Sequence, residues 1–290
     1  MQLCSGQILA SYFSIPRRWV NHNISLAVSF LCVLLCSNWS SDLLASGLST
    51  VNPFTIPQGA YVAEQVEDRD HLSIMRFSGN YDASLENGVF NAPARAVIAN
   101  EFYKNHPDNY DFLVVFTAFD FQMPPETVAF YHGVKNDTQG IGLPQFDNSL
   151  LYGSDGKLQG FIDMGNVSDR VYDPLQPEFE AVISTMAHET LHRWGIFVRY
   201  QDENGQPSED ILGRQNAHWS FFLDSDASVQ LGHRWRDNGD GTFTAVAARR
   251  FYNPLDLYLM GFNTKEQVPP MSLITPTDDE FSRLDIPRTG

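Results

Sequence analysis

Two histidines and a glutamate stand close together at positions 188, 189 and 192, in the order His-Glu-Thr-Leu-His. Helical residues four apart lie on one face about a turn from each other, so the imidazoles of His188 and His192 can hold one metal ion between them. Zinc lowers the pKa of a bound water to about 7, and the Glu189 carboxylate can take its proton as the water attacks a carbonyl. The pattern therefore predicts a mononuclear zinc site that hydrolyses peptide bonds, with Glu189 as general base.

The residues around this motif have the pattern of an amphipathic helix from about Leu175 to Trp194, after Asp173 and Pro174 and ending near Gly195. At about 100° per residue, one side of this helix is apolar and can pack on a sheet. Small residues precede the histidines on another side and leave room for a substrate. In the alternative interpretation, both histidines are hydrogen-bonded helix residues and Glu189 only faces water. The apolar side consists of Phe179, Val182, Ile183 and Met186, and the other side carries Ala181, Ser184 and Thr185.

A catalytic zinc ion takes three protein ligands and one water, so a third ligand is needed. We expect His218, which stands in an aromatic neighbourhood and would complete a neutral set of ligands. A carboxylate ligand is the alternative, and Asp256 is the most interesting because it lies in an apolar run, where a buried carboxylate needs a partner. Asp256 could instead accept a hydrogen bond from a ligand histidine, or begin a short helix. The other candidates are Glu209, Asp210, Asp224 and, more weakly, His233.

Several further residues allow two interpretations each. Tyr252 and Tyr258 could stabilise an oxyanion or simply pack. The segment 237–242, Asp-Asn-Gly-Asp-Gly-Thr, could bind Ca²⁺ or form a hairpin turn, and 202–205 is similar.

The segment 188–195, His-Glu-Thr-Leu-His-Arg-Trp-Gly, resembles the active-site helix of the zincin metallopeptidases. Gly195 matches the glycine of the metzincin pattern H-E-x-x-H-x-x-G-x-x-H, but Val198 stands where that pattern has its third histidine. Leishmanolysin-like metzincins tolerate a long insertion there, followed by a methionine turn, and His218 and Met260 are similar to that outline. The resemblance implies that Met260 lies beneath the metal, and the alternative is a methionine in the core. The resemblance implies a zincin-like α+β fold and a substrate bound by strand addition beside residues 131–144.

The rest of the chain favours a mixed sheet and an active-site helix in a first lobe, followed by a smaller, loop-rich second lobe. We expect a helix over 92–106 that begins near Asn91 and Pro93, a buried strand over 111–119, and strands over 127–131 and 160–167. Short helices are expected around 220–223 and 255–260.

The N-terminal region has the features of a secretory signal. Arg17 and Arg18 precede an apolar run over 24–36, which is shorter than the roughly 20 residues of a membrane span. We expect residues 1–46 to be a signal peptide or, alternatively, an uncleaved anchor, with 47–60 as a linker and 61–290 as the catalytic domain. The lobes would be 61–195 and 196–290. The signal features predict a secreted or periplasmic protein. Cys4, Cys32 and Cys36 all lie before the domain, so we expect the mature protein to have no thiolate ligands.

The composition sets further bounds. The 290 residues are 43% hydrophobic, enough for the core of one catalytic domain. The net charge of -16 argues against a nucleic-acid partner, because phosphate binding needs clustered Lys and Arg. The charge does not indicate a substrate, and it is the motif at 188–192 that leads us to expect a protein or peptide substrate. The rival hypothesis is an extracellular binding or adhesion module that keeps a zincin-like shell without cleaving, and Glu189 favours catalysis because binding alone does not need it.

Overall fold

The computed structural model describes residues 4–13, 56, 59–125, 127–171, 173–248 and 250–276. The chain divides into two compact units, the first comprising residues up to Asp137 and Pro144–Glu189, the second Thr138–Leu143 and the residues from Thr190 on. The boundary thus falls before the expected one at residue 195. The apolar run 24–36 lies outside the described residues, so the signal or anchor stays a prediction, as does most of the linker. Within the described ranges, no helix is long and apolar enough to cross a bilayer.

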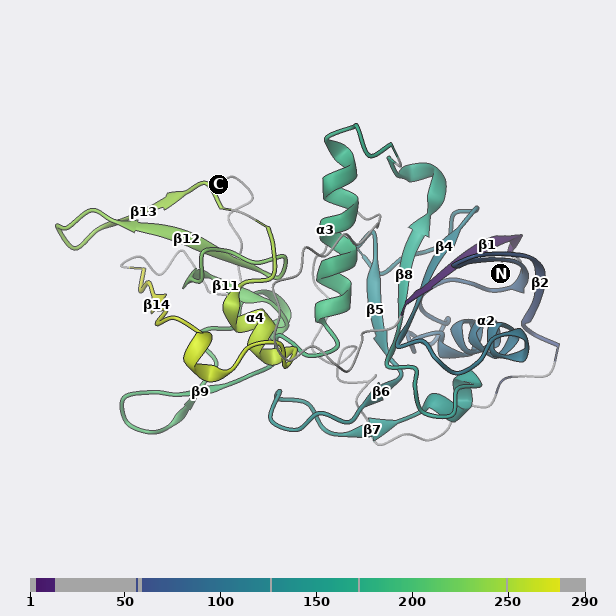
Figure 1. Ribbon diagram of the computed structural model, residues 1–290, viewed down its shortest axis with the longest axis horizontal. Coiled ribbons are helices and arrows are strands. Elements are labelled where there is room, and N and C mark those ends of the chain that lie inside the picture. Colours follow the sequence, from purple (N-terminus) through teal and green to yellow (C-terminus); the bar gives the residue numbers. More distant parts are fainter. Residues whose placement is uncertain are drawn as a thin grey trace. The chain divides into compact units, whose positions relative to one another are not determined.

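A six-stranded sheet forms the centre of the first unit (Figure 1). Its order is β2-β3-β1-β4-β8-β5; β4 and β8 run parallel, and the other neighbours are antiparallel. The expected strands over 111–119 and 160–167 are confirmed as β4 and β8, whereas the strand expected over 127–131 begins only at Phe130. The strands are β1 (Cys4–Phe13), β2 (Val62–Arg69), β3 (Leu72–Gly79), β4 (Phe112–Thr117), β5 (Phe130–Gly133) and β8 (Gly160–Asn166).

Strands β1, β2 and β3 of this sheet were not predicted from the sequence, and the residues of β1 were assigned to the signal or anchor. Strand β1 pairs with β3 on one side and with β4 on the other. Ile8 and Ala10 are fully buried in the core of the unit. These residues therefore form an interior strand in the structure.

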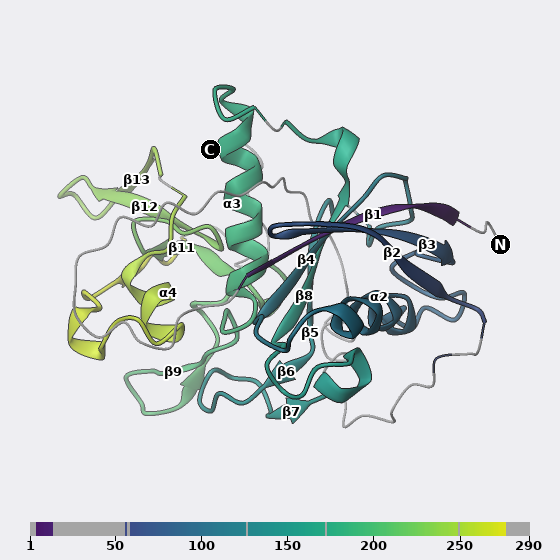
Figure 2. The same ribbon diagram turned by 45° about the vertical axis from the view of Figure 1, so that its right-hand side comes forward.

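Helix α2 (Ala92–Asn105) confirms the helix expected over 92–106 and places Ile98 and Phe102 in the core with residues of the sheet. Asn91 precedes it but does not cap it with its side chain; the Asn91 amide donates to the carbonyl oxygens of Asn80 and Asp82. In Figure 2, where β4, β8 and β5 overlap, α2 lies on one side of these strands and α3 on the other. Helix α3 extends over Glu178–Leu191.

The long helix is shorter at both ends than the sequence predicted. Residues 174–177 form turns before it, and the chain leaves the helix in a tight turn after Leu191. Val182 and Met186 of the expected apolar side are buried, whereas Phe179 and Ile183 are half-buried. The short elements of the first unit are β6 (Lys135–Asn136), β7 (Phe146–Asp147), η1 (Ser149–Tyr152) and η2 (Val167–Asp169).

The second unit contains a four-stranded sheet of order β13-β12-β11-β14, which the loop-rich expectation missed. The helix expected over 220–223 is wrong, since these residues belong to strand β11, held by β12 on one side and β14 on the other. The helix expected over 255–260 is confirmed as α4. The elements are β9 (Tyr200–Gln201), β10 (Pro207–Ser208), η3 (Arg214–Asn216), β11 (Trp219–Asp224), β12 (Leu231–Asp237), β13 (Phe243–Val246), α4 (Pro254–Leu259), η4 (Lys265–Gln267) and β14 (Ser272–Leu273).

Candidate metal centre

His188 and His192 lie on either side of the end of α3, whereas the sequence predicted both within the helix. His188 lies in the helix and is fully buried, and His192 follows the last helical residue and is half-buried. The main-chain N–H groups of Trp194 and Gly195 both donate to the Leu191 carbonyl oxygen, at 2.9 and 3.0 Å, which ends the helix in a tight turn. His188 therefore lies in the last turn of the helix, and His192 lies in the turn by which the chain leaves it.

His218 lies between η3 and β11, and its main chain is fixed by close contacts. The Gly213 N–H donates to the His218 carbonyl oxygen at 2.7 Å. A Cβ atom at Gly213 would come within 2.6 Å of the Trp219 carbonyl oxygen, so only glycine allows this approach. Gln215 and Asn216 have φ values of 60° and 51°, and this bend belongs to the turn that leads into His218.

The same turn determines which nitrogen of His218 is available to a metal. Nδ1 of His218 lies 2.9 Å from the Arg214 carbonyl oxygen, which can only accept a hydrogen bond. Nδ1 must therefore carry the proton, and Nε2 keeps the lone pair that a metal ligand needs. A ligand histidine that donates its other N–H to a carbonyl is the usual arrangement in metal sites, because that bond fixes both tautomer and ring orientation.

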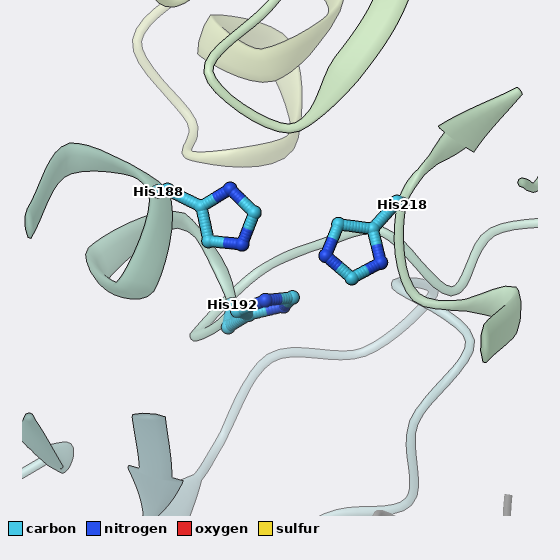
Figure 3. A group of neighbouring side chains, drawn as sticks. All are labelled: His188, His192 and His218. Carbon is cyan, nitrogen blue, oxygen red and sulfur yellow. The ribbon is translucent and has the colours of Figure 1, made fainter. Parts of the chain in front are cut away.

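The three histidines come together in the structure. One ligand nitrogen from each of His188, His192 and His218 lies within 4.8 Å of the others. The rings of His192 and His218 meet edge to face, with centroids 5.2 Å apart and planes at 89°. Figure 3 shows His188 and His218 each turning a ring nitrogen toward the space between them, with His192 seen edge-on beside it.

This arrangement fits a tetrahedral metal ion. Zn–N bonds of about 2.0–2.1 Å place ligand nitrogens roughly 3.3 Å apart, so the separations need shrink by no more than roughly 1.5 Å. Small rotations of the imidazoles about their side-chain torsions supply such a movement. Three neutral nitrogen ligands leave a fourth position for water, as in catalytic rather than closed sites.

Glu189 lies next to the first ligand and is only 3% exposed. Thr185 and Thr190 of the same helix are also buried, so the end of α3 that carries the histidines is enclosed rather than solvated. A carboxylate in such surroundings is costly unless charge or hydrogen bonds compensate it.

The carboxylates that the sequence offered as alternative third ligands are engaged elsewhere. Among the described residues, the one group of histidine, cysteine and acidic side chains that could hold a metal is the histidine cluster. Glu209 accepts a hydrogen bond from Arg199 Nε at 2.7 Å, and Asp210 accepts one from the Ser208 hydroxyl at 2.8 Å. Asp224 accepts the Trp235 main-chain N–H at 3.0 Å.

Asp256 is fully buried but lies outside the histidine cluster. Its carboxylate accepts hydrogen bonds from Trp219 Nε1, the Ser228 hydroxyl and the Asn253 main-chain N–H. With Asn253 it forms the capping box of α4, so the expectation of a helix N-terminal aspartate is confirmed. Burial raises the pKa of Asp256 to about 6, although all three hydrogen bonds act in the opposite direction. The sequence signalled a buried acid here, but nothing in it identified Trp219 and Ser228 as partners.

The structure decides between the two interpretations for some of the other residues. Tyr258 is 43% exposed, and Tyr252 and Met260 are half-buried. His233 in β12 stacks on Phe221, with ring centroids 4.6 Å apart, and burial lowers its pKa. The segment 237–242 joins β12 to β13 in an antiparallel hairpin, as one of its two interpretations predicted. The segment 202–205 likewise forms the turn between β9 and β10.

Of the glycine-containing segment 131–144, which precedes α3, only Thr138–Leu143 belong to the second unit. Arg193, next to His192, lies with Nη2 3.5 Å from the Thr138 hydroxyl. A Cβ atom at Gly142 would lie 2.0 Å from the Phe197 carbonyl oxygen, so this segment passes against the chain that leaves the histidine turn. The sequence had marked the segment as a possible rim of a substrate site, which stays a prediction.

Comparison with known proteins gives no relative from which the chemistry could be read. No protein-family model matches the chain, and neither the curated proteins nor the solved structures contain a match.

Proposed function

We propose that this protein is a zinc-dependent peptidase of zincin-like architecture, with His188, His192 and His218 as metal ligands. The observation that carries the proposal is the approach of one nitrogen from each histidine to within 4.8 Å of the other two. His188 and His192 come from one helix end, whereas His218 follows in the chain only after η3, so the triad is more than local sequence proximity. The tautomer of His218 set by Arg214 is the one that a metal ligand requires.

Zinc is among the metals that suit this set of ligands. Imidazole nitrogens favour zinc and the later transition metals over Mg²⁺ and Ca²⁺, which prefer oxygen. When bound, zinc would supply a water of lowered pKa and a Lewis acid for the peptide carbonyl. The Ca²⁺ alternative for the segment 237–242 stays a prediction.

Glu189 is the residue that distinguishes a hydrolase from a binding site. In the proposed mechanism its carboxylate accepts the proton of the attacking water and then delivers it to the departing amine. The low exposure of Glu189 keeps bulk water from competing for that proton. We also propose that the protein is exported and acts on a protein or peptide substrate outside the cytoplasm. The proposal of export rests on the apolar run 24–36.

The test combines metal analysis with hydrolysis of an unstructured protein such as casein. We expect about one zinc per chain in the wild type and a loss of at least about 100-fold in hydrolysis for Glu189→Gln with zinc retained. Glu180→Gln is the matched control, because Glu180 is exposed on the same helix. His218→Ala should lose most of its zinc. Full activity in Glu189→Gln would refute the general base, and zinc binding without any hydrolysis would favour the non-cleaving module.

A further inference from the structure

The residue after the proposed third ligand is held by an unusually buried hydrogen bond. Trp219 is fully buried, and its indole N–H donates to Asp256 Oδ1 at 2.8 Å. The two residues are 37 positions apart, and Asp256 is also fully buried. This bond therefore ties the first residue of β11 to the first turn of α4.

The same carboxylate closes a ring of hydrogen bonds around the start of β11. The Ser228 hydroxyl donates to Asp256 Oδ2 at 2.6 Å and accepts the Gln230 N–H at 2.9 Å. The Gln230 carbonyl oxygen in turn accepts the Trp219 N–H at 2.9 Å. Trp219 is thus fixed through both its main chain and its side chain, and each path leads to Asp256.

Capping of α4 alone does not account for this arrangement. The Asn253–Asp256 capping box needs only the N–H of Asn253 and the N–H of Asp256, at 2.9 and 2.8 Å. An exposed aspartate would satisfy these bonds without the desolvation cost of a buried carboxylate. The remaining acceptor capacity of Asp256 goes to Trp219 and Ser228, both in the segment that follows His218.

We propose that Asp256 is a positioning residue for the metal centre, holding Trp219 and through it the main chain of His218. The inference rests on the proposed function, because it presupposes that His218 binds the metal. His188 is placed by α3 and His192 by the turn that directly follows it, but the position of His218 depends on tertiary contacts. Arg214 and Gly213 fix His218 from the preceding turn, and Asp256 fixes it from the following strand.

The experiment measures zinc affinity by chelator competition for the full chain, with urea unfolding of the metal-free protein alongside. Trp219→Phe keeps an aromatic side chain, although a smaller one, and removes the indole N–H, and Asp256→Asn keeps the size but loses acceptor capacity. We expect each to weaken zinc binding about tenfold, at the lower end for residues that orient ligands. The double variant should be no weaker than the worse single variant, because both break the same link.

Matched controls separate this link from general damage to the sheet. Trp235→Phe removes an indole N–H that donates to the Phe221 carbonyl oxygen at 2.9 Å, and Asp224→Asn changes an acid that accepts a main-chain N–H. Both should stay within twofold of the wild-type affinity.

The outcomes distinguish this inference from the proposed function. A wild-type chain that fails to bind zinc overturns both. Zinc binding by the wild type with affinity unchanged in Trp219→Phe overturns only the positioning role, even if the metal-free variant is less stable. If Asp256→Asn does not fold, Trp219→Phe alone decides the result.

Discussion

His132 provides a prediction whose size follows directly from its surroundings. Its ring in β5 stacks on Phe90, with centroids 4.4 Å apart, and its Nε2 lies 2.5 Å from the Tyr152 hydroxyl oxygen. Burial, together with the positive charge of Arg95, lowers the pKa of His132 from 6.5 to about 3. The folded chain therefore keeps this imidazole neutral over a pH range in which the unfolded chain protonates it.

The sign and magnitude of the effect follow by linkage. Between pH 6.5 and 3 the unfolded state binds a proton that the folded state does not, so the free energy of unfolding falls as the pH falls. Each pKa unit is worth about 1.4 kcal/mol, so the interval from pH 6.5 to 4.5 amounts to about 2.7 kcal/mol. Because the residue is only half-buried, solvent screening reduces this to roughly 2 kcal/mol.

The assay is urea unfolding of the chelator-treated chain at pH 7 and pH 4.5, since metal ligands would add their own proton dependence. His132→Gln keeps a polar partner for Tyr152 but does not titrate, so it should lose roughly 2 kcal/mol less than the wild type on acidification. His71→Gln, which removes an exposed histidine, should follow the wild type. Parallel losses in the wild type and His132→Gln would refute the reasoning, because they would mean that the folded chain accepts the proton.

Two further predictions concern packing and charge. Gly142→Ala should lower the free energy of unfolding by about 2–4 kcal/mol and Gly140→Ala by only about 1 kcal/mol, measured by urea unfolding. Both glycines have φ near +85°, but only Gly142 would bring a Cβ atom against Phe197, so equal losses would contradict the clash. Arg95→Met should cost about 3–5 kcal/mol, because Asp163, 3.0 Å away and fully buried, would lose its cation. Replacing both members by apolar residues should restore most of that stability, and a double variant as unstable as Arg95→Met would exclude this explanation.

The elements predicted well from sequence are those with strong local patterns. The run of apolar residues in β4 and the proline in the first turn of α2 suffice to place both elements, because they need no knowledge of distant partners. Helix α3 was found for the same reason, although its ends were misplaced. The helix ends after Leu191 because of main-chain hydrogen bonds, which a pattern of side chains does not predict.

Strands β1 and β11 were missed because their structure depends on partners far along the chain. β1 becomes an interior strand only through pairing with β3 and β4, and its neighbourhood in sequence indicates a leader. β11 shows little alternation of buried and exposed residues, and it is held by β12 and β14. Local propensity cannot identify such strands, since cross-strand contacts decide them.

The candidate site likewise has a part that local sequence predicts and a part that depends on distant contacts. The spacing of His188 and His192 is a local property of a helix, so the sequence was enough to pair them. His218 was only the preferred one of several possible ligands, and tertiary structure was needed to bring its ring within reach. The hydrogen-bond donors to Asp256 could not be predicted. A buried carboxylate requires donors, but the sequence does not show which residues provide them.

This division explains why His218 needs contacts from elsewhere in the fold to hold it in place. A helix and the turn that follows it position two histidines at no further cost, whereas a ligand outside them must be fixed by interactions that cannot relax. At His218 these are the Arg214 carbonyl, the close approach at Gly213 and the link from Asp256 through Trp219. We therefore expect substitutions in the second unit to weaken zinc binding most when the replaced residue contacts His218 or a residue bonded to it. The size of this effect should not follow the loss in free energy of unfolding.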